Sequence, residues 1–317
     1  MGNSAMLRAS TLRIGLAVAI LTGCGGAQNA TMPQSSAVAQ GRINRATSSD
    51  LLYVSELGGG SKVEILTYPQ GQLLATFAPH GDVTFLCSDS EGDVWIPSIG
   101  VVYGYTHGST KPSRALDAPN TQMNACSVDS RTGNVAVIGE STSGPVLKVW
   151  PHASGTPTTY AVPFYGHFVT YDGSGNIFVG GDGQSEQLLM AELPKNGSTL
   201  TNVTIDQPAL GCGNLGSDGN YITVGTINRT DPKAKRHVMY RVQFTGSSGH
   251  VVQTTAFNNW NPYLEAWTDG TTLLGVRHQY KDAGIGFWKY QKGGNPFKKI
   301  TGFTDPQGLT ISVGSKS

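Results

Sequence analysis

The feature that most constrains the fold of this chain is a phrase that recurs about every 42 residues. Each copy holds a polar turn rich in Asp and Gly, a short apolar strand, a second strand with an aromatic residue, and a turn that contains Gly. The turns lie 41 to 51 residues apart, at Asp50, Gly92, Gly133, Gly175, Gly219 and Gly270. Six copies at this spacing are typical of a β-propeller, in which each copy builds one blade.

The second half of each copy supports an all-β fold. Short runs of β-branched and aromatic residues are closed by turns that contain Pro or Gly, which is the pattern of strands in hairpins. These runs are 63–68, 101–105, 146–150, 188–193, 238–244 and 285–290. The aromatic residues that recur at one hairpin position should pack one blade against the next; they are Tyr68, Tyr105, Trp150, Phe244 and Tyr290.

A further short segment precedes each polar turn and should be the innermost strand of its blade. These segments are 83–87, 125–128, 168–171, 211–214, 264–267 and 308–312. The chain opens at Leu51 with the second strand of a blade and closes with a first strand, so both ends should share one blade. The sequence therefore predicts a six-bladed propeller over residues 49–317, with the C-terminal strand completing the first blade.

The N-terminus has the pattern of an export signal. Arg8 and Arg13 precede an apolar run at 14–21, which is too short to span a bilayer but suits a signal peptide. Leu21-Thr22-Gly23-Cys24 follows and resembles the bacterial lipobox. The resemblance implies that residues 1–23 are a lipoprotein signal peptide and that Cys24 becomes the lipidated first residue. The alternative is ordinary cleavage and free secretion.

The next segment, 24–48, should act as a flexible tether, because it is rich in small polar residues and has few large apolar ones. Gly25, and not Asp, follows the cysteine. By resemblance to lipoprotein sorting in bacteria with two membranes, that residue favours the outer membrane if the host has one. The predicted partner of this region is the membrane itself, through the lipid anchor.

The low charge of the chain limits the classes of molecule that it could bind. Charged residues make up 14% of the chain, the net charge is +1, and no basic cluster is present. Nucleic-acid binding depends on Lys and Arg that neutralise phosphates, so a nucleic-acid partner is not expected. A protein, peptide or glycan ligand remains compatible with this composition.

The turn phrase has a family resemblance. Its clearest copy, Asp172-x-x-Gly175-Asn176-x-x-Val179, resembles NHL-repeat, regucalcin/gluconolactonase-like and streptogramin-lyase-like propellers. The lyase-like group implies a catalytic His with a metal at the channel mouth, and the gluconolactonase-like group implies a metal cage of Glu, Asn and Asp. Neither motif matches this chain position by position. The fold alone does not carry a function.

Residues that break the repeat are better candidates for a site than residues that recur. Several belong to loops that should open on one face of the ring, where they would form a ligand-binding mouth: Tyr165, His167, Tyr263, Glu265, Arg277 and His278. A metal site needs at least three converging ligands with groups that orient them. No close-spaced set of this kind is present, so we assign no metal site and no catalytic residue.

Three cysteines, Cys87, Cys126 and Cys212, lie in or beside predicted innermost strands. An exported protein can hold disulfides. However, three is an odd number, and neighbouring innermost strands often diverge beyond the roughly 7 Å between Cα atoms that a disulfide allows. We therefore favour small buried side chains over a disulfide at these positions.

We favour a membrane-anchored, extracytoplasmic propeller lipoprotein that acts as a binding scaffold and needs no cofactor. The alternative is a metal-dependent lactonase or lyase with a divalent metal at the channel mouth. The sequence favours the scaffold, because it shows an anchor and a repeat without an assembled catalytic set.

Overall fold

The computed structural model describes residues 49–58, 60–211, 213–228, 236–261, 264–277 and 282–314. They belong to one compact unit, Gln40–Ser317. The predicted signal peptide and tether, with Cys24, lie outside the described residues. Cys212, Tyr263 and His278 also lie outside them.

The first sheet joins the two ends of the described chain. Its strands are ordered β23-β1-β2-β3, with bounds Pro306–Ser312, Leu51–Glu56, Lys62–Thr67 and Leu73–Phe77. Strand β23 pairs antiparallel with β1, and the register places Leu51 opposite Ser312. This pairing confirms that the C-terminal strand completes the first blade.

The second sheet has seven strands in the order β10-β9-β8-β7-β6-β5-β4. Their bounds, from β4 to β10, are Cys87–Ser88, Val94–Pro97, Ile99–Tyr105, Arg114–Val128, Val135–Ser141, Gly144–Trp150 and Thr158–Ala161. The 15-residue strand β7 serves two groups of strands. Its first part pairs with β6 and its last part, 121–128, pairs with β8.

The third sheet, ordered β11-β12-β13-β14-β18-β17-β16-β15, also combines two groups. The bounds from β11 to β14 are Gly166–Tyr171, Ile177–Asp182, Leu188–Leu193 and Thr201–Ile205. Those from β15 to β18 are Leu215–Ser217, Ile222–Asn228, Arg236–Thr245 and Ser248–Phe257. A short parallel pairing of β14 with β18 joins the groups at their outer strands.

The fourth sheet is β19-β20-β21-β22, with bounds Ala266–Asp269, Thr272–Arg277, Gly284–Lys289 and Lys298–Thr301. Two three-residue 3₁₀ helices, Pro151–Ala153 and Gln184–Glu186, lie between strands. Within the described ranges, no helix has the length and apolar character that a membrane span requires.

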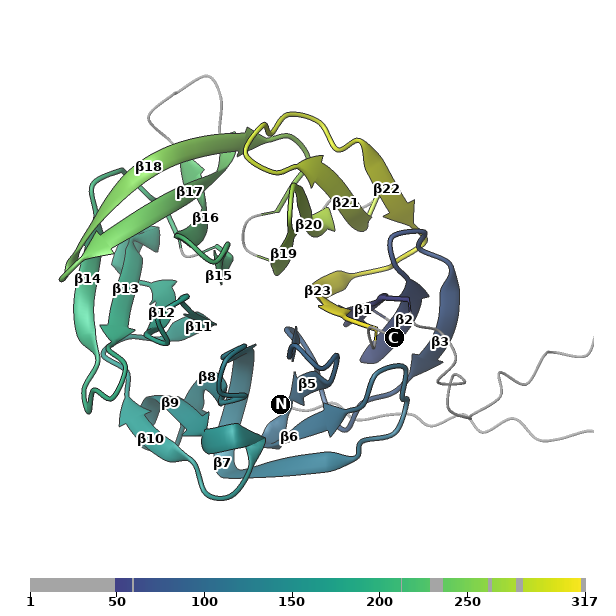
Figure 1. The fold of residues 1–317 in the computed structure, drawn as a ribbon, viewed down its shortest axis with the longest axis horizontal. Helices are drawn as coiled ribbons and strands as arrows, with labels where there is room; N and C mark the ends of the chain where they lie inside the picture. The colour runs from purple at the N-terminus through teal and green to yellow at the C-terminus, as the bar shows by residue number, and fades with distance from the viewer. Residues whose placement is uncertain are drawn as a thin grey trace, which may run out of the picture. The chain divides into compact units, whose positions relative to one another are not determined.

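When β7 is counted in both of its groups, the described strands fall into six groups of four, which we number blades 1 to 6 from the N-terminal group onward. In Figure 1 the blades stand around a common centre, with β11, β15, β19 and β23 nearest to it and β3, β10, β14 and β22 at the rim. The innermost strands therefore lie around the centre of the ring. Any group at that centre is positioned by several blades at once.

The repeated phrase has a local physical cause. Oδ1 of Asp172 accepts hydrogen bonds from the backbone amides of Ser174 and Asn176, each at 2.8 Å. Gly175 takes a φ of +90°, which a residue with a side chain rarely adopts. Asp89, Asp129 and Asp218 bind backbone amides of their own turns in the same way. The Asp and Gly positions of the repeat are therefore turn-forming residues.

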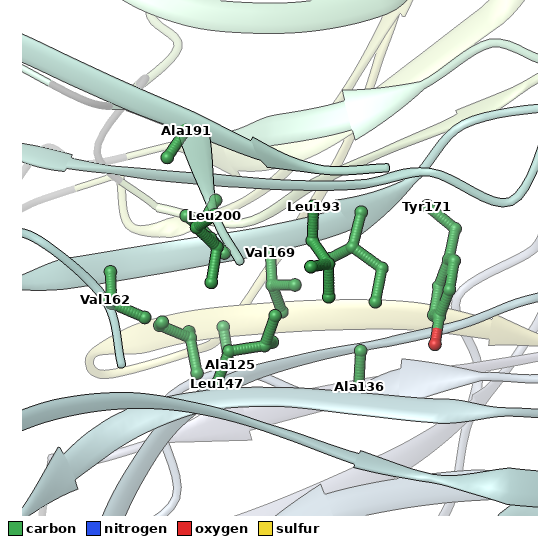
Figure 2. Packing of buried hydrophobic residues seen from close by; sticks show 12 residues of the cluster. Ala125, Ala136, Leu147, Val162, Val169, Tyr171, Ala191, Leu193 and Leu200 are labelled. Atoms are coloured by element: carbon green, nitrogen blue, oxygen red, sulfur yellow. The ribbon is translucent and has the colours of Figure 1, made fainter. Parts of the chain in front are cut away.

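The apolar core lies between neighbouring blades. Figure 2 shows one such cluster, to which blade 3 contributes Ala125 and Leu147 and blade 4 contributes Val169 and Leu193. All four of these side chains are buried. The apolar core therefore runs from blade to blade around the ring.

Candidate functional site

A cavity of about 270 Å³ lies between the innermost strands. Five of the six innermost strands contribute to its wall, which makes it a property of the ring and not of one blade. The side chains of the lining that carry polar atoms include Ser88, Ser127, Asp129, Ser130, Thr170, Tyr171, Asp172, Asn214, Ser217, Thr223, Glu265, Trp267 and Thr268. The chain therefore builds a cavity with polar and apolar surface in similar amounts at the centre of the ring.

The cavity has an outer end and an inner end. Ser130, Gly173 and Gly219 lie in the polar turns, are exposed, and form the outer end. Asn214 and Glu265 precede the innermost strands of blades 5 and 6, are buried, and form the inner end. The cavity therefore opens on the face that carries the Asp and Gly turns.

A segment of blade 2, Thr84 to Leu86, lies over the inner end. The Thr84 hydroxyl donates to the carbonyl of Asn124 in blade 3, at 3.3 Å. The ring of Phe85 lies 4.9 Å from that of Phe168 in blade 4. The Leu86 amide donates to Oε2 of Glu265, before blade 6, at 3.2 Å. This segment was predicted as part of an innermost strand, but β4 begins only at Cys87 because these residues bind other blades.

Glu265 is the most constrained polar group of the cavity. Its Oε2 accepts two backbone amides, from Leu86 at 3.2 Å and from Leu309 at 2.9 Å. Burial raises the pKa of this carboxyl well above its ordinary range, and the two hydrogen bonds offset only part of that effect. Its Oε1 has no hydrogen-bond partner within the described chain. Glu265 therefore holds its proton more tightly than an exposed carboxyl group does, and it places Oε1 at the inner end of the cavity.

Several other polar groups of the cavity wall already form hydrogen bonds within the protein. The Ser127 hydroxyl accepts the backbone amide of Tyr171 at 3.2 Å, which leaves its own proton to donate. Nδ2 of Asn214 donates to the carbonyl of Ala266 at 3.3 Å. Asp129 and Asp172 hold their own turns. Ser127 was not singled out from the sequence; its place on an innermost strand, next to a cysteine, was the available signal.

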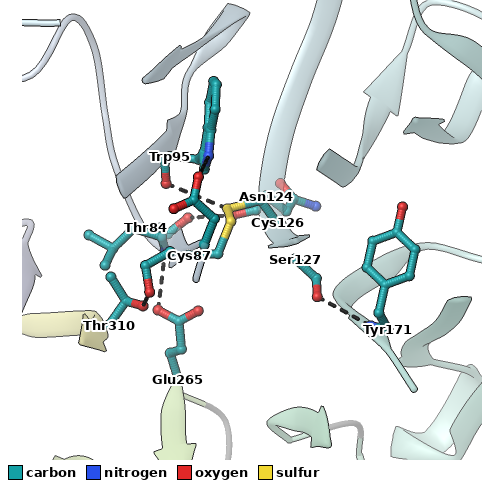
Figure 3. The surroundings of a disulfide bond; sticks show 12 residues. Thr84, Cys87, Trp95, Asn124, Cys126, Ser127, Tyr171, Glu265 and Thr310 are labelled. Carbon is teal, nitrogen blue, oxygen red and sulfur yellow. Dashed lines mark hydrogen bonds between the residues drawn. A yellow bond between two sulfur atoms is a disulfide. The ribbon is translucent and has the colours of Figure 1, made fainter. Parts of the chain in front are cut away.

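Cys87 and Cys126 also line the cavity, and they form a disulfide. Our expectation of small buried thiols was therefore wrong for these two residues. Their Cα atoms lie 5.7 Å apart, within the distance that a disulfide needs, because the innermost strands of blades 2 and 3 are close at the ring centre. Figure 3 shows the bond, with Glu265 pointing toward the segment that leads into it.

Two residues of the predicted mouth, Tyr165 and His167, come together outside the cavity. Their rings meet edge to face with centroids 5.0 Å apart, and Tyr165 is 46% exposed. Nε2 of His167 lies 3.3 Å from Oδ2 of Asp182. Neither Tyr165 nor His167 lines the cavity. Only Glu265 among the described mouth residues does so.

Arg277, a third residue of the predicted mouth, ends β20 and is 1% exposed. Nη2 lies 3.4 Å from Oδ2 of Asp282, whereas Nε and Nη1 have no hydrogen-bond partner in the described part of the chain. A guanidinium group with so few partners is costly to bury. Arg277 is absent from the cavity lining, and the last two predicted mouth residues, Tyr263 and His278, lie outside the described residues.

Metal-binding groups do not assemble in the described ranges: no three His, Cys, Asp or Glu side chains come close enough together there to hold an ion. In the part of the chain that the structure describes, the His167–Asp182 pair belongs to no group of three such side chains. Three or more ligands are the usual minimum for a protein metal site. The chemistry that the described cavity offers is hydrogen bonding from hydroxyl, amide and carboxyl groups.

The radial sheets, the pairing of the last strand with the first, and the central cavity define a β-propeller. Two solved structures share the fold. A protein of unknown function from Bacteroides caccae is 12% identical with a TM-score of 0.61, over 83% of this chain and 99% of that one. A chain of a nidogen/laminin complex is 10% identical with a TM-score of 0.63, over 84% and 100% of the respective chains. At these identities the likeness concerns the fold alone. No protein-family model and no curated protein matches the sequence.

Proposed function

We propose that this protein is an exported, lipid-anchored β-propeller that binds a small molecule in its central cavity. The observation that carries the proposal is the cavity itself, which carries polar groups, is open at one end and is lined by five blades. Concave sites with a few convergent polar groups are typical small-molecule sites. A rigid ring holds those groups in place before any ligand arrives, which lowers the cost of binding.

Export and anchoring rest on the lipobox-like segment that ends at Cys24. The Cys87–Cys126 disulfide supports an extracytoplasmic location, because such bonds persist in oxidising compartments. Gly25 after the lipidated cysteine favours the outer membrane where the host has two membranes. The tether of residues 24–48 would then hold the propeller away from the lipid surface.

The acidic groups of the cavity favour binding over catalysis, because each of them accepts hydrogen bonds from the backbone. Asp129 and Asp172 hold backbone amides of their turns, and Glu265 holds two backbone amides that join three blades. Carboxyl groups with these structural roles are poorly placed to act as nucleophiles or mobile bases. The wall can therefore recognise a ligand without transforming it.

The second candidate is a metal-dependent lactonase or lyase, and the His167–Asp182 pair favours it. Ion analysis of the purified protein separates the two candidates. The scaffold proposal expects no stoichiometric divalent metal in the protein. A stoichiometric metal that His167→Ala removes would overturn the scaffold proposal and favour the enzyme candidate.

Two experiments test the lead proposal. Labelled fatty acid should be incorporated into the wild-type protein and not into Cys24→Ser; equal incorporation contradicts the anchor. For binding, a thermal-shift screen of small metabolites of all charges should find compounds that stabilise the wild-type protein. Ser130→Trp, at the exposed outer end of the cavity, should abolish that stabilisation. A screen in which no compound acts on the wild type contradicts a cavity ligand.

A further inference from the structure

The polar groups of the cavity lining are mostly hydroxyl groups. The lining contains seven Ser or Thr hydroxyl groups, one Asn amide and three carboxyl groups, and it contains no Lys, Arg or His side chain. An anionic ligand would therefore meet carboxyl groups without a compensating cation in the wall. The lining excludes phosphates and carboxylates as favoured ligands.

The two Asp residues offer a ligand few free oxygen acceptors. Oδ1 of Asp172 already accepts two backbone amides, and its Oδ2 accepts Nδ2 of Asn176 at 2.8 Å. Asp129 accepts Thr132 Oγ1 at 2.7 Å and lies 3.6 Å from Nε of Arg131. Both carboxylates belong to the turns at the outer end of the cavity. Most of their oxygen acceptor positions are therefore already occupied before a ligand enters.

The inner end offers hydrogen-bonding groups, and burial disfavours the charged form of its one carboxyl group, Glu265. Glu265 is 8% exposed, and its Oε1 is free of hydrogen-bond partners within the described chain. A neutral carboxyl group can donate from one oxygen while the other accepts the amides of Leu86 and Leu309. Ser127 also keeps a proton to donate. A ligand with oxygen acceptors fits this end.

We propose that the cavity binds a small neutral molecule that carries several hydroxyl groups, of the size of a monosaccharide or polyol. This inference rests on the proposed function, namely that the cavity is a ligand site. Hydroxyl groups can both donate to and accept from the Ser, Thr and Asn side chains of the wall. Phe168 and Trp267, which also line the cavity, provide apolar surface for the carbon skeleton.

The size of the cavity sets the size of the ligand. Its volume of about 270 Å³ is at the lower limit of small-molecule sites, which span roughly 300–1,000 Å³. The Thr84–Leu86 segment lies over the inner end, so a longer molecule would have to extend through the outer end. The cavity therefore fits a single sugar unit better than an oligosaccharide.

The test compares probes of one size and three charges. Neutral aldohexoses and hexitols are titrated calorimetrically into the purified protein, alongside glucosamine as the cationic probe and gluconate as the anionic probe. At least one neutral probe should bind at least tenfold more tightly than both charged probes. Ser130→Trp should weaken that binding at least tenfold. Ser174→Trp, on an exposed turn residue outside the lining, should leave it unchanged.

Glu265→Gln adds a test that does not depend on the entrance. The amide keeps an acceptor for the two backbone amides and a donor for a neutral ligand, so binding of the neutral probe should change by less than about fivefold. A ligand that needs an ionised carboxylate would lose most of its affinity. Tighter binding of glucosamine or gluconate, blocked by Ser130→Trp, overturns the neutral ligand class but keeps a cavity ligand. Absence of binding by all probes and by the wider metabolite screen overturns both proposals.

Discussion

The hydroxyl of Tyr290 in blade 6 donates a hydrogen bond to Oδ2 of Asp218 in blade 5, at 2.7 Å. Tyr68 of blade 1 makes the same kind of bond to Asp269 of blade 6, at 2.6 Å. Each bond joins the aromatic residue of one hairpin to the polar turn of the preceding blade. The prediction that these hairpin aromatics link neighbouring blades is confirmed for Tyr68 and Tyr290.

Loss of the Tyr290 hydroxyl should weaken the contact between blades 5 and 6. We expect Tyr290→Phe to lower the free energy of unfolding by about 1–2 kcal/mol, because Asp218 is a charged acceptor that is partly buried. Urea denaturation at neutral pH measures the change. The matched control is Tyr165→Phe, since Tyr165 is exposed; an equal loss in both variants would contradict the inter-blade role.

Glu265 should make the stability of the ring depend on pH. Burial raises its pKa above the ordinary value of 4.5, so the folded protein holds a proton that the unfolded chain releases above that pH. The stability that this proton contributes is complete below about pH 4.5 and is lost as the pH rises through the folded pKa.

Glu265→Gln should remove this dependence, because the amide does not ionise. Denaturation curves between pH 5 and pH 8 should show a smaller decline for the variant than for the wild type. Glu91→Gln, in an exposed turn, serves as the control. If wild type and Glu265→Gln lose stability in parallel, Glu265 is not held neutral.

The Cys87–Cys126 disulfide should contribute strongly to stability. The two cysteines are 39 residues apart in the sequence, and closing a loop of that length stabilises a protein by about 4 kcal/mol in the chain-entropy model. The double variant Cys87→Ala/Cys126→Ala should therefore unfold at lower urea concentration by a corresponding amount. Thiol titration of the unreduced wild type provides the control, and reactive Cys87 or Cys126 there would show that the bond does not form.

The buried guanidinium group of Arg277 should lower the stability of the folded protein. Arg277→Met should leave stability unchanged or raise it by about 1–2 kcal/mol, because methionine fills similar space without an underpaired buried charge. Arg241→Met is the contrast, since Nε of Arg241 binds Asp218 at 2.7 Å and Nη1 binds Gln253 at 3.0 Å. That variant should be destabilised. A large loss of stability in Arg277→Met would mean that its guanidinium group is fully satisfied.

The sequence predicted the parts of the fold that depend on local interactions. The Asp172 turn forms because one carboxylate binds amides two and four residues away, so the repeat reports it directly. Closure by β23 followed from the order of strands within a copy. The shared strand β7 and the β14–β18 pairing were not predicted, because both depend on contacts between copies.

The site was less predictable, for the same reason. Glu265 was singled out because it breaks the repeat, and it does line the cavity. Its raised pKa arises from burial among blades that lie far apart in the sequence, and the amides of Leu86 and Leu309 offset that rise only in part. The disulfide was missed because the 5.7 Å between its Cα atoms is set by the curvature of the ring and not by sequence spacing.

The most direct test of the proposed ligand site is a crystal structure of the protein with the neutral probe that binds most tightly. We expect the probe to occupy the central cavity, with one of its oxygen atoms within hydrogen-bond distance of Oε1 of Glu265. A probe bound elsewhere on the ring, or a cavity that holds only ordered water at saturating probe concentration, would contradict the proposed site.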